Sequence, residues 1–221
     1  MMLSRFDAVI YDMDGVLIDS EPLWKIAMEA VFKEVGCPLT RSDFEKTVGL
    51  RIDEVIRYWY AHQPWPEVSP DAVEKRIVDR MGQLIRQHGE PLPGVLESLR
   101  FFREKGMKIG LATSSYEVLI EAVLEVLDIA SHFDYTHSAE HEEFGKPHPA
   151  VYLHTATVLG VTPTRCLVIE DSINGVISGK SARMMVFCVP EKTHEPNPKL
   201  IVADALFDNL HEVIQHFTTH Q

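Results

Sequence analysis

The residues best suited to chemistry are two aspartates, Asp12 and Asp14, which directly follow the apolar run Val9-Ile10-Tyr11. If that run is a strand of a parallel sheet, both carboxylates lie in the crevice at the carboxyl end of the strands, where such sheets bind ligands. Paired carboxylates there suit a hard divalent cation such as Mg²⁺. An isolated Asp-x-Asp pair is more often a turn or a loop cap, so the interpretation depends on further signals elsewhere in the chain.

Polar residues follow a second apolar run and occupy a later loop. Thr113 and Ser114 come at the end of residues 108–113, where their hydroxyl and main-chain N–H groups can bind an anion at the start of the next helix. The alternative is a plain helix cap. Lys146 lies in a loop beside Pro147, where an ammonium can act as a fixed point charge toward phosphate, although a single loop lysine is usually only solvated.

A second acidic strand end, Glu170-Asp171, follows the apolar run Cys166-Leu167-Val168-Ile169. Two acidic strand ends at the same edge of a sheet can share one metal ion. The sequence therefore predicts that these carboxylates converge with Asp12 and Asp14 on a magnesium site.

The elements that would position these residues alternate between short β-branched runs and segments with helical periodicity. This pattern is typical of an α/β fold, a Rossmann-like parallel sheet with helices on both faces. Five strands are predicted, over Phe6 to Tyr11, Lys108 to Thr113, Tyr135 to Ser138, Arg165 to Glu170 and Met185 to Val189. A closing helix is predicted from Leu206 to Thr219.

Residues 20–89 interrupt this alternation, because they hold helical segments and no convincing strand. We therefore predict a catalytic core of residues 1–19 and 90–221 with an inserted helical cap domain of residues 20–89. Ser69 before Pro70 is a helix-start signal within the cap. An apolar stripe at Ile52, Val55, Ile56, Trp59 and Tyr60 predicts another cap helix.

Composition bounds the class of protein. The chain has 221 residues, 45% of them hydrophobic, and a formal net charge of −12. That charge disfavours nucleic acid and anionic membrane as partners, because both would be repelled. The N-terminal sequence has no signal segment and no spanning stretch, so we expect a cytoplasmic protein, and a monomer. Three cysteines are an odd count and are expected to be reduced core or structural residues.

Together, Asp12-x-Asp14, Thr113, Lys146 and Glu170-Asp171 resemble the four motifs of the haloacid dehalogenase superfamily, in its phosphatase branch with a helical cap. The resemblance spans nearly the whole chain. Within that branch, the stretches Gly49-Leu50-Arg51-Ile52-Asp53, Trp59-Tyr60 and Gln63-Pro64-Trp65 look like the hexitol and 2-deoxyglucose 6-phosphate phosphatases. The resemblance implies a magnesium-dependent enzyme, a phosphoric monoester hydrolase that acts on a small sugar phosphate.

The chemistry of such a reaction explains the residue types. A carboxylate that attacks a phosphate dianion must overcome about 4 kcal/mol for each unit-charge pair, or roughly 8 kcal/mol in all, so compensating positive charge is needed. Asp12 is predicted to form an aspartyl-phosphate, while Asp14 protonates the leaving oxygen and later takes a proton from water. The resemblance implies that the Asp12 side chain, the Asp14 main-chain carbonyl and Asp171 hold Mg²⁺, with Glu170 acting through water. The remaining candidate phosphate- or substrate-binding residues are Met13, Thr113, Ser114, Lys146, Arg51 and Asn174.

Three other functions fit parts of the pattern. A dehalogenase would not need the acid at Asp14 or a magnesium site. A sugar phosphate mutase similar to β-phosphoglucomutase shares the four motifs, but such mutases carry a His where Trp24 lies here, so a restraint on Asp14 is not expected and hydrolysis is favoured. A non-catalytic sugar phosphate binding protein would not require both a nucleophile and an acid.

Some residues admit two interpretations. Five histidines lie close together in the sequence: His132, His137, His141, His148 and His154. Only His137 and His141 have the spacing of two metal ligands on one helix, and they fall at a predicted strand end and loop. A transition-metal site is therefore not expected. Arg51, beside Gly49, is the best candidate to reach substrate from the cap. Asn174 either contacts substrate or caps its helix.

Overall fold

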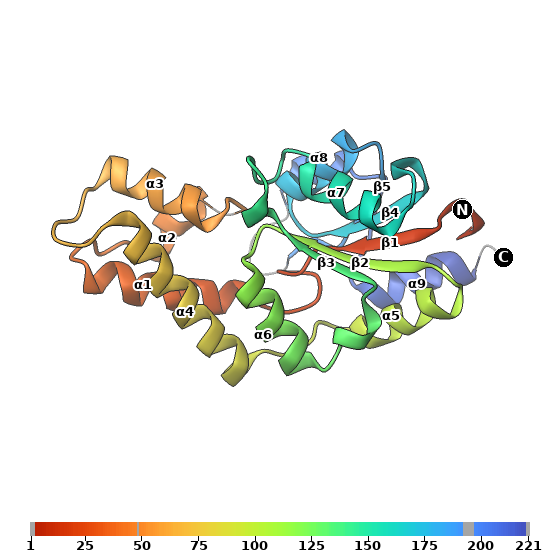
Figure 1. Ribbon diagram of the computed structural model, residues 1–221, viewed down its shortest axis with the longest axis horizontal. Coiled ribbons are helices and arrows are strands. Elements are labelled where there is room, and N and C mark those ends of the chain that lie inside the picture. Colours follow the sequence, from red (N-terminus) through yellow and green to blue (C-terminus); the bar gives the residue numbers. More distant parts are fainter. Residues whose placement is uncertain (1–2, 48, 192–196, 220–221) are drawn as a thin grey trace.

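All strands in the described part of the chain belong to one parallel sheet (Figure 1). The computed structural model describes residues 3–47, 49–191 and 197–219. The strand order is β3-β2-β1-β4-β5-β6. The bounds are β1 Ala8–Tyr11, β2 Lys108–Thr113, β3 Tyr135–Ser138, β4 Cys166–Glu170, β5 Met185–Cys188 and β6 Ala205–Leu206.

The five predicted strands are all present: β2 and β3 have the predicted bounds, and β1, β4 and β5 each have one end shifted by one or two residues. The strand β6 was not predicted from sequence, because it has only two residues, and its pairing to β5 places Phe187 opposite Ala205. This pairing also makes the predicted start of the closing helix wrong. Helix α9 spans Leu210–Thr218 and is capped by Asn209, whose side chain accepts a hydrogen bond from the main-chain N–H of Glu212.

Helices cover both faces of the sheet, as predicted (Figure 1). Successive residues of β1 point to opposite faces, so Val9 and Tyr11 pack in one apolar cluster and Ala8 and Ile10 in the other. The first cluster includes helices α5 (Val95–Glu104), α6 (Glu117–Leu127) and α9; the second includes α7 (Ala150–Leu159) and α8 (Ile173–Ser181). The 3₁₀ turns are η1 Leu3–Arg5, η2 Glu45–Thr47, η3 Ala130–His132, η4 Ala139–His141, η5 Pro163–Arg165 and η6 Pro198–Val202.

Between β1 and α5, the described residues form a group of four α-helices at the left of Figure 1. They are α1 Glu21–Glu34, α2 Arg41–Phe44, α3 Ile52–His62 and α4 Pro70–His88. The side chain of Ser69 accepts a hydrogen bond from the N–H of Ala72, which confirms the predicted helix start. The predicted stripe on α3 is buried except at Tyr60, which is 37% exposed.

The two chain segments that connect these helices with the sheet lie side by side. Ile18 bridges to Asp14 and to Pro91, and the N–H of Leu92 donates to the carbonyl of Leu17 at 3.1 Å. The domain boundaries at 19/20 and 89/90 stay predictions. Cys37, Cys166 and Cys188 are buried thiols.

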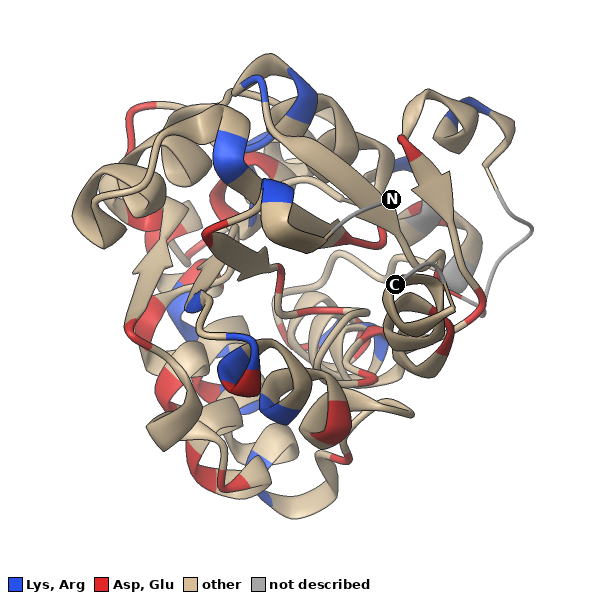
Figure 2. Cartoon of the chain, turned by 90° about the vertical axis from the view of Figure 1, so that its right-hand side faces the viewer, with Lys and Arg blue, Asp and Glu red and all other residues tan. Residues whose placement is uncertain are grey.

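Charged residues of both signs are distributed over the elements seen in Figure 2. The chain carries 33 acidic and 21 basic residues, and the predicted repulsion from nucleic acid rests on that excess. Among the described residues, the helices are all too short or too polar to cross a bilayer.

Candidate active site

One cavity of about 760 Å³ lies where the carboxyl ends of β1, β2 and β4 face the group α1 to α4. The parallel sheet brings these strand ends to one edge, which is why loops far apart in sequence meet there. Nine of the ten predicted site residues line the cavity: Asp12, Asp14, Arg51, Thr113, Ser114, Lys146, Glu170, Asp171 and Asn174. Met13 does not line it, because its side chain is fully buried in the core, so only its main chain is available to a ligand.

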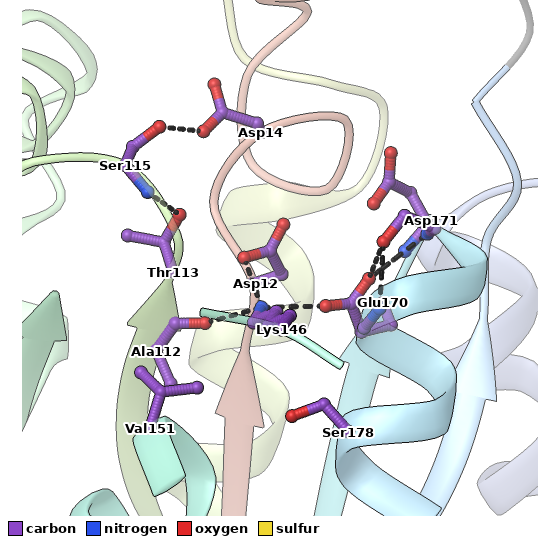
Figure 3. Close-up of polar contacts among 12 residues, drawn as sticks. Asp12, Asp14, Ala112, Thr113, Ser115, Lys146, Val151, Glu170, Asp171 and Ser178 are labelled. Atoms are coloured by element: carbon purple, nitrogen blue, oxygen red, sulfur yellow. Dashed lines mark hydrogen bonds and ion pairs between the residues drawn. The ribbon is translucent and has the colours of Figure 1, made fainter. Parts of the chain in front are cut away.

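Lys146 lies at the floor of the cavity and contacts the carboxylates of Asp12 and Glu170 (Figure 3). Its Nζ donates to Asp12 Oδ1 and to Glu170 Oε1, both at 2.7 Å, and to the carbonyl of Ala112 at 3.0 Å. The residue is only 5% exposed. Burial by itself would lower the pKa of Lys146, but the two carboxylates outweigh it and raise that pKa. The ammonium is therefore a permanent charge beside Asp12.

Three carboxylates, from Asp12, Glu170 and Asp171, place oxygens within 4.8 Å of one another. Burial raises the pKa of Asp12 to about 7, with Glu170 and Asp14 adding to the rise and Lys146 opposing it. Burial also raises the pKa of Asp171, reinforced by Glu170 and Asp12. One ammonium thus does not compensate three carboxylates, and the oxygen donors fit a hard divalent cation.

Glu170 is the best-satisfied carboxylate of the three. Its Oε1 accepts from Lys146 and from the Tyr152 hydroxyl at 2.8 Å. Its Oε2 accepts from the N–H of Asp171 at 2.9 Å and from the N–H and hydroxyl of Ser172, both at 3.1 Å. A Cβ on Gly175 would lie 1.7 Å from Glu170 Oε1, so the close approach of α8 requires glycine. Because both oxygens already accept hydrogen bonds, Asp12 and Asp171 are better placed for direct metal ligation.

Asp14 is held apart from this cluster by three donors. Ser20 Oγ donates to Oδ1 at 2.5 Å, the Trp24 indole N–H donates to the same oxygen at 3.1 Å, and Ser115 Oγ donates to Oδ2 at 2.6 Å. Figure 3 shows the carboxylate of Asp14 turned toward Ser115, above Asp12. The expectation that position 24 offers no restraint on Asp14 is therefore wrong, because an indole N–H is a hydrogen-bond donor as well as a bulky ring.

The polar residues after β2 line the same cavity. Thr113 is buried, and its Oγ1 accepts from the N–H of Ser115 at 3.1 Å. Ser114 follows it on the cavity wall. The plain helix-cap alternative is wrong, because Tyr116 is the N-cap residue of α6 and no side chain caps that position. The anion-binding role of this segment stays a prediction.

Arg51 and Asn174 join the helical group to the sheet at the cavity wall. Arg51 forms a two-point ion pair with Asp53, at 2.6 and 2.9 Å, and its Nη1 donates to the carbonyls of Ala139 at 2.8 Å and Glu142 at 3.2 Å. Asn174 Nδ2 donates to the carbonyl of Gly49 at 3.0 Å. The capping interpretation of Asn174 is wrong, because Ser172 caps α8 through a bond from the N–H of Gly175.

Sequence reasoning missed several residues of the site. Ser20 and Trp24 are on or next to the first turn of α1, and Tyr152 lies on α7, where helical spacing indicates only core packing. The Tyr152 hydroxyl accepts from Lys146 at 2.9 Å and donates to Glu170. A tyrosine on a buried helix face needs a hydrogen-bond partner for its hydroxyl. That requirement could have indicated from the sequence that Tyr152 contacts a polar group.

Known proteins are similar to this chain over most of its length. The family described as haloacid dehalogenase-like hydrolase matches residues 9–189. Hexitol phosphatase B of Escherichia coli K12 is 42% identical over 207 residues, 93% of each chain. A solved structure of a putative β-phosphoglucomutase from Thermotoga maritima is 29% identical, with a TM-score of 0.76 and coverage of 98% of this chain and 100% of that one. CbbY from Rhodobacter sphaeroides in complex with phosphate has a TM-score of 0.85 at 23% identity, covering 94% and 96%, and shows the shared fold.

Proposed function

The chain belongs to the haloacid dehalogenase-like hydrolase family, and from this premise we propose that it is a phosphatase that hydrolyses small sugar phosphates of the hexose or hexitol 6-phosphate type. The observation that carries the proposal is the pair of separately held carboxylates in one cavity. Asp12 lies against Lys146, whereas Asp14 is held by Ser20, Trp24 and Ser115. The similarity to hexitol phosphatase B over 93% of the chain supports the substrate class.

In the proposed first step, a carboxylate oxygen of Asp12 attacks phosphorus and the bond from phosphorus to the sugar oxygen breaks. Asp14 gives a proton to that oxygen, because an alkoxide is a poor leaving group. Water then attacks phosphorus and gives a proton to Asp14, while the bond from phosphorus to the Asp12 oxygen breaks. Inorganic phosphate leaves, and both residues are restored. Asp14 must turn from its contact with Ser115 to reach the leaving group, and its position beside α1 couples that turn to the helical group.

Charge compensation decides whether the attack is possible. An anionic nucleophile and a phosphate dianion repel by roughly 8 kcal/mol at about 4 Å and an effective dielectric near 20. Lys146 is fixed at 2.7 Å from Asp12 Oδ1 and supplies one positive charge. A bound Mg²⁺ would supply the rest by neutralising the phosphate oxygens. We propose that Asp12, Asp171 and the main-chain carbonyl of Asp14 hold it, with Glu170 in an outer position.

Magnesium binding is expected to release protons at slightly acid pH. The pKa of Asp12 is raised to about 7, so this carboxyl binds a proton below pH 7 in the metal-free protein and must lose it to bind the ion. Burial shifts the pKa of Asp171 in the same direction. Lowering the pH through 7 should therefore weaken Mg²⁺ affinity. Calorimetric titration with Mg²⁺ in two buffers of different ionisation enthalpy, at pH 6 and pH 8.5, measures the protons released. Equal release at both values would contradict the assignment.

The substrate class is tested by a phosphate-release screen over hexose, hexitol and pentose phosphates, with glycolate phosphate as an acidic comparison and Mg²⁺ present. We expect the highest kcat/KM on a hexose or hexitol phosphate. Glucose 1-phosphate is followed separately for isomerisation, since conversion to the 6-phosphate without phosphate release would show a mutase instead. A chain that binds these compounds but releases no phosphate would be a binding protein. A monomeric state, a cytoplasmic location and the lack of nucleic-acid and membrane partners remain predictions.

A further inference from the structure

A second group of metal-ligand side chains shares no residue with the catalytic cavity. It consists of His137 at the end of β3, Glu142 just after η4 and His154 on α7. Helical spacing in the sequence points to His137 with His141, whereas the fold brings His154 to His137 from seventeen positions away. Three separate elements thus contribute one ligand atom each.

The geometry is that of two imidazoles converging on one carboxylate oxygen. Glu142 Oε1 lies 2.8 Å from His137 Nε2 and 3.2 Å from His154 Nδ1. We propose that these three residues form a binding site for a transition-metal dication of the Zn²⁺ type, separate from the magnesium site. His137 is 5% exposed, and the side chains of Glu142 and His154 are 17% and 46% exposed, so the site has a buried wall and an open side through which an ion can enter.

The donor set selects the class of metal. Two imidazole nitrogens and one carboxylate oxygen suit zinc, which binds such ligands at about 2.0–2.2 Å in tetrahedral geometry, whereas Mg²⁺ prefers oxygen alone. Ligand atoms of a tetrahedral zinc are about 3.3–3.5 Å apart, so the carboxylate needs to move only by tenths of an ångström. Burial lowers the pKa of His137, with His154 and His141 adding to the fall and Glu142 opposing it, so the ring is kept in the neutral, ligating form.

One rearrangement is required. The rings of His137 and His154 stack with centroids 4.0 Å apart and planes at 27°, but a metal ion must lie in the plane of each ring that binds it. His154 is the exposed partner, and its other nitrogen contacts the Tyr135 hydroxyl at a long 3.4 Å. A turn of the His154 ring therefore breaks one long hydrogen bond and the stacking of this ring on Tyr135 and His137.

Metal binding here would stabilise the loop that contacts the helical group. The main-chain carbonyl of Glu142 accepts a hydrogen bond from Arg51, so an ion on the Glu142 side chain would tie that loop to β3 and α7. A neighbouring set, Glu117, Glu140 and His141, has side chains that are 64%, 26% and 52% exposed, and it contains a single imidazole. His141 of this neighbouring set provides the matched control for the proposed zinc site.

The test is calorimetric titration of the full chain with ZnCl₂ in a large excess of Mg²⁺, which keeps the oxygen-rich cavity occupied. We expect one zinc per chain, affinity at least about tenfold weaker in His154→Gln and Glu142→Gln, and no change in His141→Gln. Co²⁺ in place of Zn²⁺ should give the visible absorption of a four-coordinate ion. At a hundredfold excess over Kd, zinc should raise the Tm of the native chain by roughly 5–10 °C.

His154 is exposed, so His154→Gln is expected to retain the native Tm without zinc, and phosphate release with Mg²⁺ alone should be unchanged in that variant. Both readouts separate this inference from the proposed phosphatase activity. Failure to bind zinc in the presence of Mg²⁺ would overturn the proposal. So would zinc binding that survives in both His154→Gln and Glu142→Gln, or that is lost in His141→Gln, because the ion would then lie elsewhere.

Discussion

Asp12→Asn is expected to reduce phosphate release by at least about 10⁴-fold with Mg²⁺ and substrate saturating, because an amide cannot serve as the attacking nucleophile. The substitution keeps the shape of the side chain and retains an oxygen that can accept from Lys146, which lies 2.7 Å from Asp12 Oδ1. The loss should therefore appear in kcat and reflect chemistry. Steady-state phosphate release under saturating conditions measures it.

The Asp12→Asn variant is expected to remain folded. Burial raises the pKa of Asp12 to about 7, which means that folding favours its neutral form, and a neutral amide meets that preference. Lys146 still pairs with Glu170. Thermal unfolding without Mg²⁺ checks this point, with the exposed Asp208→Asn as the matched control for both activity and stability. Near-normal turnover in Asp12→Asn would contradict the proposed covalent mechanism.

Asp14→Asn is expected to separate the two chemical steps. Loss of a general acid typically costs about 10²–10⁴-fold, so hydrolysis of a sugar phosphate should fall by that factor. An aryl phosphate has a leaving group that departs without a proton, so the first step should survive on that substrate. Asp14 is also the proposed base for the water, hence the second step should still be slow. We expect a burst of about one equivalent of aryl alcohol per site, followed by slow turnover.

Rapid mixing with an aryl phosphate measures this burst, and quenched samples measure the phosphate released over the same time. The control is Ser115→Ala, which removes one hydrogen bond to Asp14 but keeps its carboxylate, and it should slow sugar phosphate hydrolysis much less. An equal loss on sugar and aryl phosphates with no burst would show that Asp14 acts by positioning or metal binding alone. That outcome would contradict the acid–base role.

Much of the fold follows from local patterns. Runs such as Val9-Ile10-Tyr11 and Cys166 to Ile169 are apolar without alternation because both sheet faces are covered, and that burial makes parallel strands recognisable. The carboxyl ends of such strands share one edge, so Asp12 and Asp171 could be placed in one cluster before any distance was known. The strand β6 was not predicted, because a strand of two residues is too short to show a periodic pattern.

The partners of the site residues were decided by the tertiary structure. The Trp24 indole N–H reaches Asp14 from α1, and the Tyr152 hydroxyl reaches Lys146 from α7. Arg51 pairs with main-chain carbonyls more than eighty positions away.

Local composition was thus enough to locate five of the six described strands and the charged groups at the carboxyl edge of the sheet, because buried parallel strands are apolar on both faces. The hydrogen-bond partners of Asp14 and Glu170, and the stacking of His137 on His154, could be known only from the three-dimensional packing. These partners depend on small distances, because a hydrogen bond changes from formed to broken within a fraction of an ångström. That precision depends on the packing of elements distant in sequence, which no periodicity encodes.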